Sequence, residues 1–318
     1  MRHILPIPSA RSMILASICI ILAILVYSII FNVDLFITIV SLNPIYLSLS
    51  IFFALVSFIL ESLRLKFMTE MLNTKLNILA AIKARALGAL VAYITPSSMG
   101  GEPARAFIIS IHSDVGFWQA LGITLVEAYA DAITVCTVAL ILSISYLPYS
   151  IVVILMCIYT IAIVNGLLFL VLKTKTFSGF IEKLKDRYFK SIEKRFKINM
   201  NFVNIINGMR GLFNRKFSII IALTFIRHLI AILAIYYASL AVTNVNLIRC
   251  IEAYFFSSAL GIVPTPGAVG ALEYGLSITL LPKQVVVIRL INYVLIMALG
   301  IMSIVLVLRQ LSIRIGSK

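Results

Sequence analysis

Pairs of ionisable residues interrupt long apolar stretches of this sequence. Three pairs stand three or four residues apart, the spacing that places side chains on one face of a helix. They are Glu61 with Arg64, Glu102 with Arg105, and Glu127 with Asp131. Further charges lie in other apolar segments, namely Arg227 beside His228, then Glu252, Glu273 and Arg289. Charges so placed need polar partners, which makes them the candidates for chemistry.

The composition indicates the environment of these charges. Hydrophobic residues make up 62% of the 318 residues, charged residues 12%, and the mean hydropathy is +1.10. Uncharged runs at 12–33, 35–60, 132–172 and 290–308 reach the ~18–20 residues that a spanning helix needs. We therefore expect an all-α polytopic membrane protein with a single transmembrane domain over residues 1–318. A charge at the bilayer centre costs about 2.5–3.5 kcal/mol, so buried charges must face a polar interior or one another.

The basic residues set the expected topology. Between residues 173 and 216 there are twelve basic and three acidic residues, a net charge of +9. The positive-inside rule places this loop, the N-terminus and the C-terminal tail in the cytoplasm. About six full helices follow, at 12–33, 45–65, 117–144, 150–172, 217–242 and 285–308, with Lys66, Lys75, Lys83 and Arg85 on the cytoplasmic side. The apolar residues from Phe177 to Phe196 recur at helical spacing, which fits either a membrane-surface helix or an ordinary positive-inside loop.

Two segments are left that must begin and end on the same side of the membrane. They lie at about 76–112 and 249–283, and each contains two short apolar halves around a break. The breaks share the pattern T-P-x-x-x-G, formed by Thr95, Pro96 and Gly100 in one segment. In the other segment the pattern is formed by Thr265, Pro266 and Gly270. We expect two oppositely oriented re-entrant helical hairpins, related as an inverted repeat, whose breaks meet near the midplane.

Such breaks leave polar backbone groups that need a partner. Proline lacks an N–H and glycine frees φ, and the helix that begins after the break directs its free N–H groups at an anion. Arg105, Arg227 and Arg289 are the candidates to hold a lipid phosphate, because guanidinium groups match phosphate oxygens and stay charged. The alternative for each break is a re-entrant packing device without ligand. Glu61, Arg64 and Arg289 have a separate alternative, in which they lie near enough to an interface for their charged ends to reach water.

The acids have two open roles. Glu102, Glu127, Asp131 and Glu273 either balance the arginines in an empty site, or carry protons or bind an amine headgroup. No metal site or cofactor is expected, because no second His or Cys stands at ligand spacing from His228 and the four cysteines show no paired spacing.

The motifs TPSSMGGEPARA, VEAYADA and PTPGAVGALE, together with Arg289, carry a family resemblance. The sequence resembles the flippase-like, lysylphosphatidylglycerol synthetase transmembrane-domain family over about residues 12–310. In the best-known members this membrane module stands beside a soluble synthetase and moves the aminoacylated lipid between leaflets. In relatives it accompanies or acts on other lipids, including polyprenyl-linked ones. Only the membrane module is recognised here, so aminoacyl transfer is not implied.

The resemblance extends the set of candidate site residues. With the charges named above, the predicted substrate-binding residues are Thr95, Pro96, Gly100, Gly101, Glu102, Arg105, Glu127, Asp131, Arg227, Pro266, Gly267, Gly270, Glu273 and Arg289. Pro264 belongs to the same second motif. Two positions depart from the family pattern. Ala128 stands where relatives often have Arg, which weakens a phosphate clamp, and Ala268 stands where a second Gly is usual, which stiffens the second break.

We therefore expect a flippase-like lipid transporter of the plasma membrane, taking an anionic, polyprenyl-phosphate-linked or aminoacylated lipid through a central polar site. No Walker motif is present, so transport is passive or ion-coupled. An enzyme is not expected, because the sequence lacks a Cys–His pair and a G-x-S-x-G elbow. The alternative is a non-catalytic anchor for a membrane-associated partner, such as a glycosyltransferase or a lipid-modifying enzyme, docked on the basic loop. Nucleic-acid binding is not expected, and the oligomeric state, a homo-oligomer included, is left open.

Overall fold

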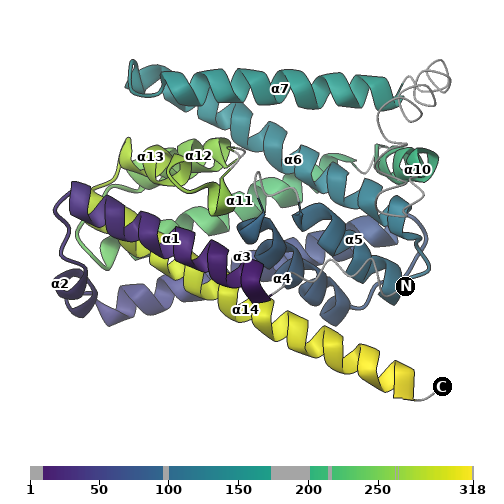
Figure 1. Cartoon of the computed structure of the whole chain (residues 1–318). Helices are drawn as coiled ribbons and strands as arrows, with labels where there is room; N and C mark the ends of the chain where they lie inside the picture. Colours follow the sequence, from purple (N-terminus) through teal and green to yellow (C-terminus); the bar gives the residue numbers. More distant parts are fainter. Residues whose placement is uncertain are drawn as a thin grey trace.

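The computed structural model describes residues 10–95, 100–172, 201–213, 217–261, 263 and 265–316 (Figure 1). These residues form helices and turns, and no strand occurs among them. Within the described residues, six helices are long and apolar enough to cross a bilayer. They contain Met13–Ile30, Pro44–Glu70, Phe117–Tyr146, Ile151–Phe169, Phe217–Leu240 and Pro282–Arg309. The predicted all-α architecture with about six spans is confirmed.

The described part of the chain contains long helices separated by shorter ones. They are α1 (Ala10–Ile30), α2 (Leu35–Val40), α3 (Pro44–Glu70), α4 (Ile78–Ile94), α5 (Gly101–His112), α6 (Phe117–Ser143), η2 (Ile144–Tyr146), α7 (Ile151–Leu172), α10 (Phe202–Leu212), α11 (Phe217–Leu240), α12 (Leu247–Leu260), η4 (Pro266–Ala268), α13 (Ala271–Ser277) and α14 (Pro282–Gly316). The uncharged run at 35–60 is thus divided between α2 and α3, a break that its apolar character concealed.

Asparagine side chains fix where three of these helices begin. The side-chain oxygens of Asn43, Asn77 and Asn246 accept backbone N–H groups at the starts of α3, α4 and α12, over 3.0, 3.1 and 3.0 Å. These N–H groups have no partner within the helix, so a capping oxygen removes an otherwise unpaired donor. The caps place the first turn of each helix independently of the apolar pattern.

The bundle is layered around α4. Figure 1 shows α7 along the outside of α6, and α1 beside α14 on the other side of the molecule. Between them, α4 packs against α3, α5 and α14, while α11 packs along α3. Leu87 and Leu90 of α4 are fully buried. This short helix therefore lies at the centre, where its side chains can reach several spans.

The two interrupted segments are pairs of short helices. Helix α4 packs against α5 in the first, and α12 against α13 in the second. In Figure 1, α5 lies toward the end of the bundle where α14 finishes, and α13 lies toward the opposite end, near α2. Helix α4 has 17 residues and α13 only seven, so the halves of the two segments differ in length. Insertion of the two segments from opposite membrane faces stays a prediction.

The breaks themselves differ in how they turn. In the first, Thr95 Oγ1 donates to the Val91 carbonyl (2.8 Å) and accepts the Gly100 N–H (3.1 Å). The intervening residues 96–99, including Pro96, lie outside the described residues. In the second break, Gly267, Ala268 and Gly270 have φ of 60, 48 and 84°. Left-handed backbone of this kind favours glycine, which explains two of the three residue types.

Part of the predicted cytoplasmic loop is a packed helix. Helix α10 lies against α6, where a Cβ on Gly208 would come within 2.3 Å of the Gln119 carbonyl oxygen. A Cβ on Gly122 would likewise lie 2.2 Å from the Ile205 carbonyl. The absence of side chains at both positions lets the two backbones approach. Residues 173–200, which include the predicted amphipathic helix, lie outside the described residues.

Candidate functional site

Arg64 occupies the centre of a buried ionic cluster. It comes from α3, its side chain is 1% exposed, and it contacts two acids of α6. Its two Nη groups donate to the two carboxylate oxygens of Asp131, each over 2.8 Å, and Nη2 also donates to Glu127 Oε1 over 2.9 Å. Thr224 of α11 accepts from Nη1 over 2.7 Å. Paired hydrogen bonds of this type are the strong ones, so Arg64 ties α3 to α6 and α11.

The first break adds a second arginine to the same acids. Arg105 of α5 donates through Nη1 to Glu127 Oε2 (2.5 Å) and through Nη2 to Glu102 Oε1 (2.7 Å). Glu127 is fully buried between Arg105 and Arg64, whereas the Glu102 side chain remains 22% exposed. The spacing of Glu102 and Arg105, three residues apart, produces the ion pair that it predicts.

Two further arginines close the cluster from α4 and α11. Arg85 donates through Nε to Glu61 and lies 3.7 Å from Glu127. Arg227 lies 3.3 Å from Glu61 and donates to Asp131 over 2.8 Å. Glu61 is thus held between two guanidinium groups that belong to helices on either side of it.

A tyrosine and a histidine extend the network into α12. Arg227 Nη1 donates to the Tyr254 hydroxyl over 3.0 Å, and His228 Nδ1 lies 2.6 Å from the same oxygen. A guanidinium only donates, so the Tyr254 hydrogen is free for His228 Nδ1, which leaves the imidazole proton on Nε2. That nitrogen lies 3.6 Å from Asp131 Oδ1 and has no hydrogen-bond partner among the described residues. It is a buried donor without an acceptor.

The charges of the cluster balance within the described part of the chain. Four arginines (Arg64, Arg85, Arg105 and Arg227) meet four acids (Glu61, Glu102, Glu127 and Asp131), and each acid contacts at least one arginine. Desolvating ions is costly unless each is paired, so the balance is a condition for burying eight charges. Even so, Nε of Arg64, Arg105 and Arg227 has no partner among the described residues. These donors leave capacity for a further acceptor.

A cavity of about 510 Å³ lies against this cluster. Its charged lining consists of Arg85, Glu102, Arg105, Asp131 and Arg227, and His228 and Tyr254 also border it. The lining includes Gly101 from the first interrupted segment and Ser258 and Gly261 from the second. The cavity therefore lies between the two segments and is polar on the side of the arginines.

Gly88 is a positioning residue for Arg105. A Cβ at this position of α4 would lie 2.4 Å from Arg105 Cγ and 3.1 Å from the Gly101 carbonyl oxygen. The side chain of Arg105 therefore crosses α4 at the one point where no side chain obstructs it. This allows Arg105 to reach Glu127 on α6 from the first turns of α5.

Glu273 and Arg289 form a second group at the other break. Arg289 of α14 donates through Nε to Glu273 Oε1 (2.6 Å) and through Nη2 to the Gly267 carbonyl (3.2 Å). Glu273 accepts the Gly270 N–H through Oε2 over 2.7 Å. Both charged side chains are almost fully buried. Their contacts hold the turn of the second break.

The second break also lies against the end of α4. A Cβ on Gly267 would lie 3.5 Å from an edge carbon of the Tyr93 ring, and the guanidinium carbon of Arg289 lies 5.8 Å from the centre of that ring. Tyr93 stands two residues before Thr95. The two breaks are therefore neighbours, although their ion pairs form separate groups.

The structure thus sorts the predicted site residues into three sets. Gly101, Glu102, Arg105, Asp131 and Arg227 line the cavity, and Glu127 lies directly behind them. Thr95 and Gly100 shape the first break, while Gly267, Gly270, Glu273 and Arg289 shape the second. The Pro266 side chain, like Pro96 and Pro264, lies outside the described residues. Substrate binding by these residues stays a prediction.

The sequence prediction omitted three residues of the cluster. The sequence predicts Arg85 on the cytoplasmic side, yet it lies inside the bundle against Glu61. For Glu61 and Arg64 the sequence leaves open whether they face a polar interior or reach the interface; Arg64 is buried at the centre. Their signal was present in the cost of an isolated charge in an apolar helix, which demands a partner. Among the described residues, no three His, Cys, Asp or Glu side chains gather to hold a metal ion.

Comparison with known proteins bears on the whole of this arrangement. The protein family described as the lysylphosphatidylglycerol synthase TM region matches residues 14–300. No curated protein and no solved structure was found to match the chain. The matched region contains every residue that lines the cavity, from Arg85 of α4 to Ile296 of α14. With six apolar helices among its described residues, this chain is a multi-pass membrane protein. It belongs to the lysylphosphatidylglycerol synthase transmembrane-region family, and this membership suggests that it takes part in lipid-related processes.

Proposed function

We propose that this protein is a flippase-like transporter that moves a lipid with an anionic headgroup between the leaflets of the plasma membrane. Polyprenyl-phosphate-linked and aminoacylated lipids belong to the proposed substrate class. The lipid leaves unchanged, since transport needs no bond to break. The proposed orientation has both termini in the cytoplasm, from the distribution of basic residues.

One observation carries the proposal: a cavity of about 510 Å³ that is bordered by three arginines and reaches both interrupted segments. Intramembrane charges that face a cavity are rare and commonly mark substrate or ion pathways. Discontinuous helices that meet at such a cavity are the usual setting for substrate sites in transporters built from repeats. The family match supports a lipid as the substrate class.

The ion pairs suggest how an anion would be accepted. Glu102 borders the cavity, is partly exposed and pairs with Arg105 alone among the described ion pairs. A lipid phosphate that approached Arg105 would take the place of the Glu102 carboxylate, so one charge-assisted pair would replace another. Such an exchange avoids leaving a buried guanidinium without a partner, which is the costly state. The acids then act as counter-ions of the empty site.

The test is leaflet exchange in proteoliposomes. The protein is reconstituted with a fluorescent phosphatidylglycerol or a labelled polyprenyl phosphate, and exchange is followed by loss of fluorescence on adding a membrane-impermeant quencher. We expect faster exchange with the protein than without it. Arg105→Ala should slow exchange by about tenfold or more, since a hydrogen bond to a charged group contributes about 1.5–3 kcal/mol.

Two controls sharpen the result. Arg105→Lys keeps the charge but cannot bridge Glu102 and Glu127 with one planar group, so we expect slow exchange by a folded protein. Lys66→Ala, which removes a surface pair with Glu70, should leave exchange unchanged. If both arginine variants exchange lipid at the normal rate, while removal of residues 178–200 abolishes capture of a lipid-modifying enzyme, the chain is an anchor rather than a transporter.

A further inference from the structure

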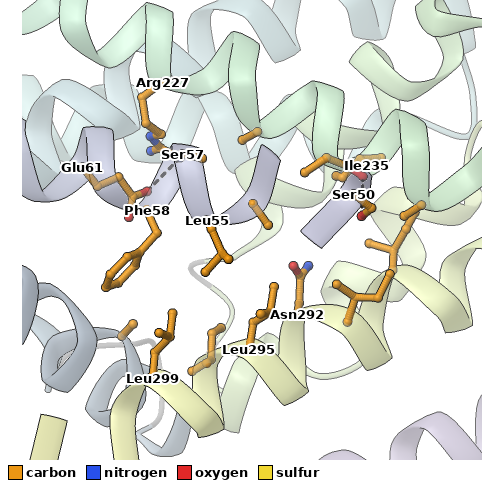
Figure 2. A pocket seen from close by; sticks show the side chains of 18 of the residues that line it. Ser50, Leu55, Ser57, Phe58, Glu61, Arg227, Ile235, Asn292, Leu295 and Leu299 are labelled. Carbon is orange, nitrogen blue, oxygen red and sulfur yellow. Dashed lines mark hydrogen bonds and ion pairs between the residues drawn. The ribbon is translucent and has the colours of Figure 1, made fainter. Parts of the chain in front are cut away.

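A second cavity, of about 280 Å³, lies between α3 and α14 (Figure 2). Helices α4 and α11 form its other walls, with Tyr254 of α12 at the cluster end. Most of its lining is apolar or small, including Leu55 and Phe58 of α3, Ala231 and Ala234 of α11, and Leu299 of α14. The walls therefore offer a smooth apolar surface with few polar groups.

The polar groups of this cavity are not evenly spread. Figure 2 shows Glu61 and Arg227 together at one end, and Ser50 and Asn292 away from them. The Ser50 hydroxyl is already used, because it donates to the Ala234 carbonyl over 2.8 Å. Arg85 joins Glu61 and Arg227 at the charged end. The cavity is thus an apolar space with one ionic end.

The cavity is open between two spans. Helices α3 and α14 both border it but do not pack closely against each other, while α11 closes the side behind them. Leu55 and Asn292, which line it from α3 and α14, are both exposed. Because α3, α11 and α14 are predicted spans, the opening faces the hydrocarbon of the bilayer.

The two cavities share a wall. Arg85 and Arg227 border both, as do Ala89, Tyr254 and Ile296. Both guanidinium groups are bound to Glu61, so this carboxylate closes the ionic end while the site is empty. A phosphate held by Arg85 and Arg227 would lie at the junction of an apolar cavity and a polar one, an arrangement that matches a lipid with a single charged head.

We infer that the cavity between α3 and α14 holds the hydrocarbon chain of an anionic lipid whose phosphate is bound by Arg85 and Arg227 in place of Glu61, a second phosphate position in the polar cavity that Arg105 also borders. This inference rests on the proposed function and extends it by assigning the chain a route through the protein. A hydrocarbon chain gains little by leaving the bilayer for an equally apolar cavity. Occupancy therefore depends on the phosphate, and a lipid without that group is not retained.

Photo-crosslinking tests this assignment. The full chain is reconstituted in phosphatidylcholine vesicles with phosphatidylglycerol that carries a diazirine near the end of one acyl chain. A diacylglycerol with the same chain serves as the probe without phosphate. After illumination, labelled residues are mapped by mass spectrometry. We expect the phosphatidylglycerol probe, and not the diacylglycerol, to label Leu295 and Leu299, whereas exposed Val294 on α14 is labelled by both.

A variant whose cavity is filled by a larger side chain is compared with a variant of the same helix whose cavity is unchanged. Ala234→Trp places a large ring in the space, and overpacking of about 1–3 kcal/mol corresponds to about tenfold less labelling of Leu299. Ala222→Trp, at an exposed alanine of the same helix, should leave labelling unchanged. Should Ala234→Trp fail to fold, Ala54→Leu narrows the same space from α3.

Two results would overturn the assignment: equal labelling of Leu299 by the two probes, or labelling that survives in the filled variants. Its failure is distinct from that of the transport proposal. If leaflet exchange is normal but the cavity is not labelled, only the proposed hydrocarbon-chain site is wrong. If the cavity is labelled but no leaflet exchange occurs, the transport proposal is wrong and the cavity is a lipid-binding site.

Discussion

At the scale of single residues, Arg64 is the most enclosed arginine of the ionic cluster and its partners depend on it. Removing one member of a buried ion pair costs about 3–5 kcal/mol, because the remaining charge stays desolvated. We therefore expect Arg64→Met to be strongly destabilised, since Asp131 loses two hydrogen bonds and Glu127 one. Thermal unfolding of the purified protein in detergent measures the effect.

Lys66→Met provides the comparison for Arg64→Met on the same helix. The Lys66 and Glu70 side chains are 30% and 37% exposed, and exposed pairs contribute about 0–1 kcal/mol. We expect a melting temperature close to that of the unmodified protein. Equal losses in the two variants would contradict the central role of Arg64.

Gly270 allows a second prediction at this scale. Its φ is 84°, yet a Cβ would find no atom within 4 Å, so an alanine there meets backbone strain without a steric clash. A non-glycine residue in left-handed backbone costs about 1–2 kcal/mol. We expect Gly270→Ala to lower the unfolding temperature in a thermal scan. Gly166→Ala, inside α7 with equally open space, should be neutral or stabilising.

The charges that face one another could be predicted only in part. Glu102 with Arg105, and Glu127 with Asp131, follow from spacing along one helix. The partners of Arg64 lie 63, 67 and 160 residues further along the chain, and no local pattern encodes them. Arg85 looked like a flanking charge because Lys83 is nearby; its burial follows from the position of α4 in the centre of the bundle.

At the scale of helices, the contact of α4 with α5 depends on Gly88. A Cβ there would overlap Arg105 Cγ, so Gly88→Ala must displace the Arg105 side chain from Glu127. Overpacking of this kind costs about 1–3 kcal/mol. We expect slower leaflet exchange together with a lower unfolding temperature, measured on the same reconstituted and detergent samples.

Gly166→Ala serves again as the helix-interior control for Gly88→Ala. Alanine is the better helix former by up to about 1 kcal/mol, so a glycine without neighbours gains stability on substitution. If Gly88→Ala behaved like Gly166→Ala in both assays, Arg105 would not depend on the close approach of α4 and α5.

The long helices and the presence of short paired helices in the two interrupted segments were predictable, whereas α2 and α10 were not. Apolar length alone identifies the six spans. Helix α2 was hidden within an uncharged run, and α10 within a basic one, where its glycine contact with α6 is visible only in three dimensions. The lengths of α4 and α13 were also not predictable, because caps and tertiary contacts, such as Asn77 and Glu273, set their limits.

At the scale of the whole molecule, α5 and α13 of the two interrupted segments lie toward opposite ends of the bundle, while the second break lies against Tyr93 near the end of α4. The inverted arrangement predicts that their tips are reached from opposite sides of the membrane. In a variant without the four native cysteines, a membrane-impermeant maleimide should label Ser98→Cys and Ala268→Cys from different sides of oriented vesicles. Labelling of both from the same side would contradict the inverted repeat.

The sequence predicted that charged helices would surround a polar centre between these segments. It did not predict that the charges divide into a cluster of eight at the cavity and a pair at the second break. That division depends on α14, which places Arg289 beside Gly267 rather than beside Asp131. The rotation of one long apolar helix is decided by packing, which the sequence does not display.

The partners of Arg64 also constrain how the chain is made. Helix α3 leaves the ribosome long before α6 and α11, so Arg64 enters the membrane when Glu127, Asp131 and Thr224 have not yet been synthesised. Glu61, one turn earlier, is the sole opposite charge available within α3 at that depth. The nascent protein must therefore keep α3 beside the insertion machinery or in a hydrated environment until the later spans arrive, and Arg64 gains its full set of partners only after α11 has been synthesised.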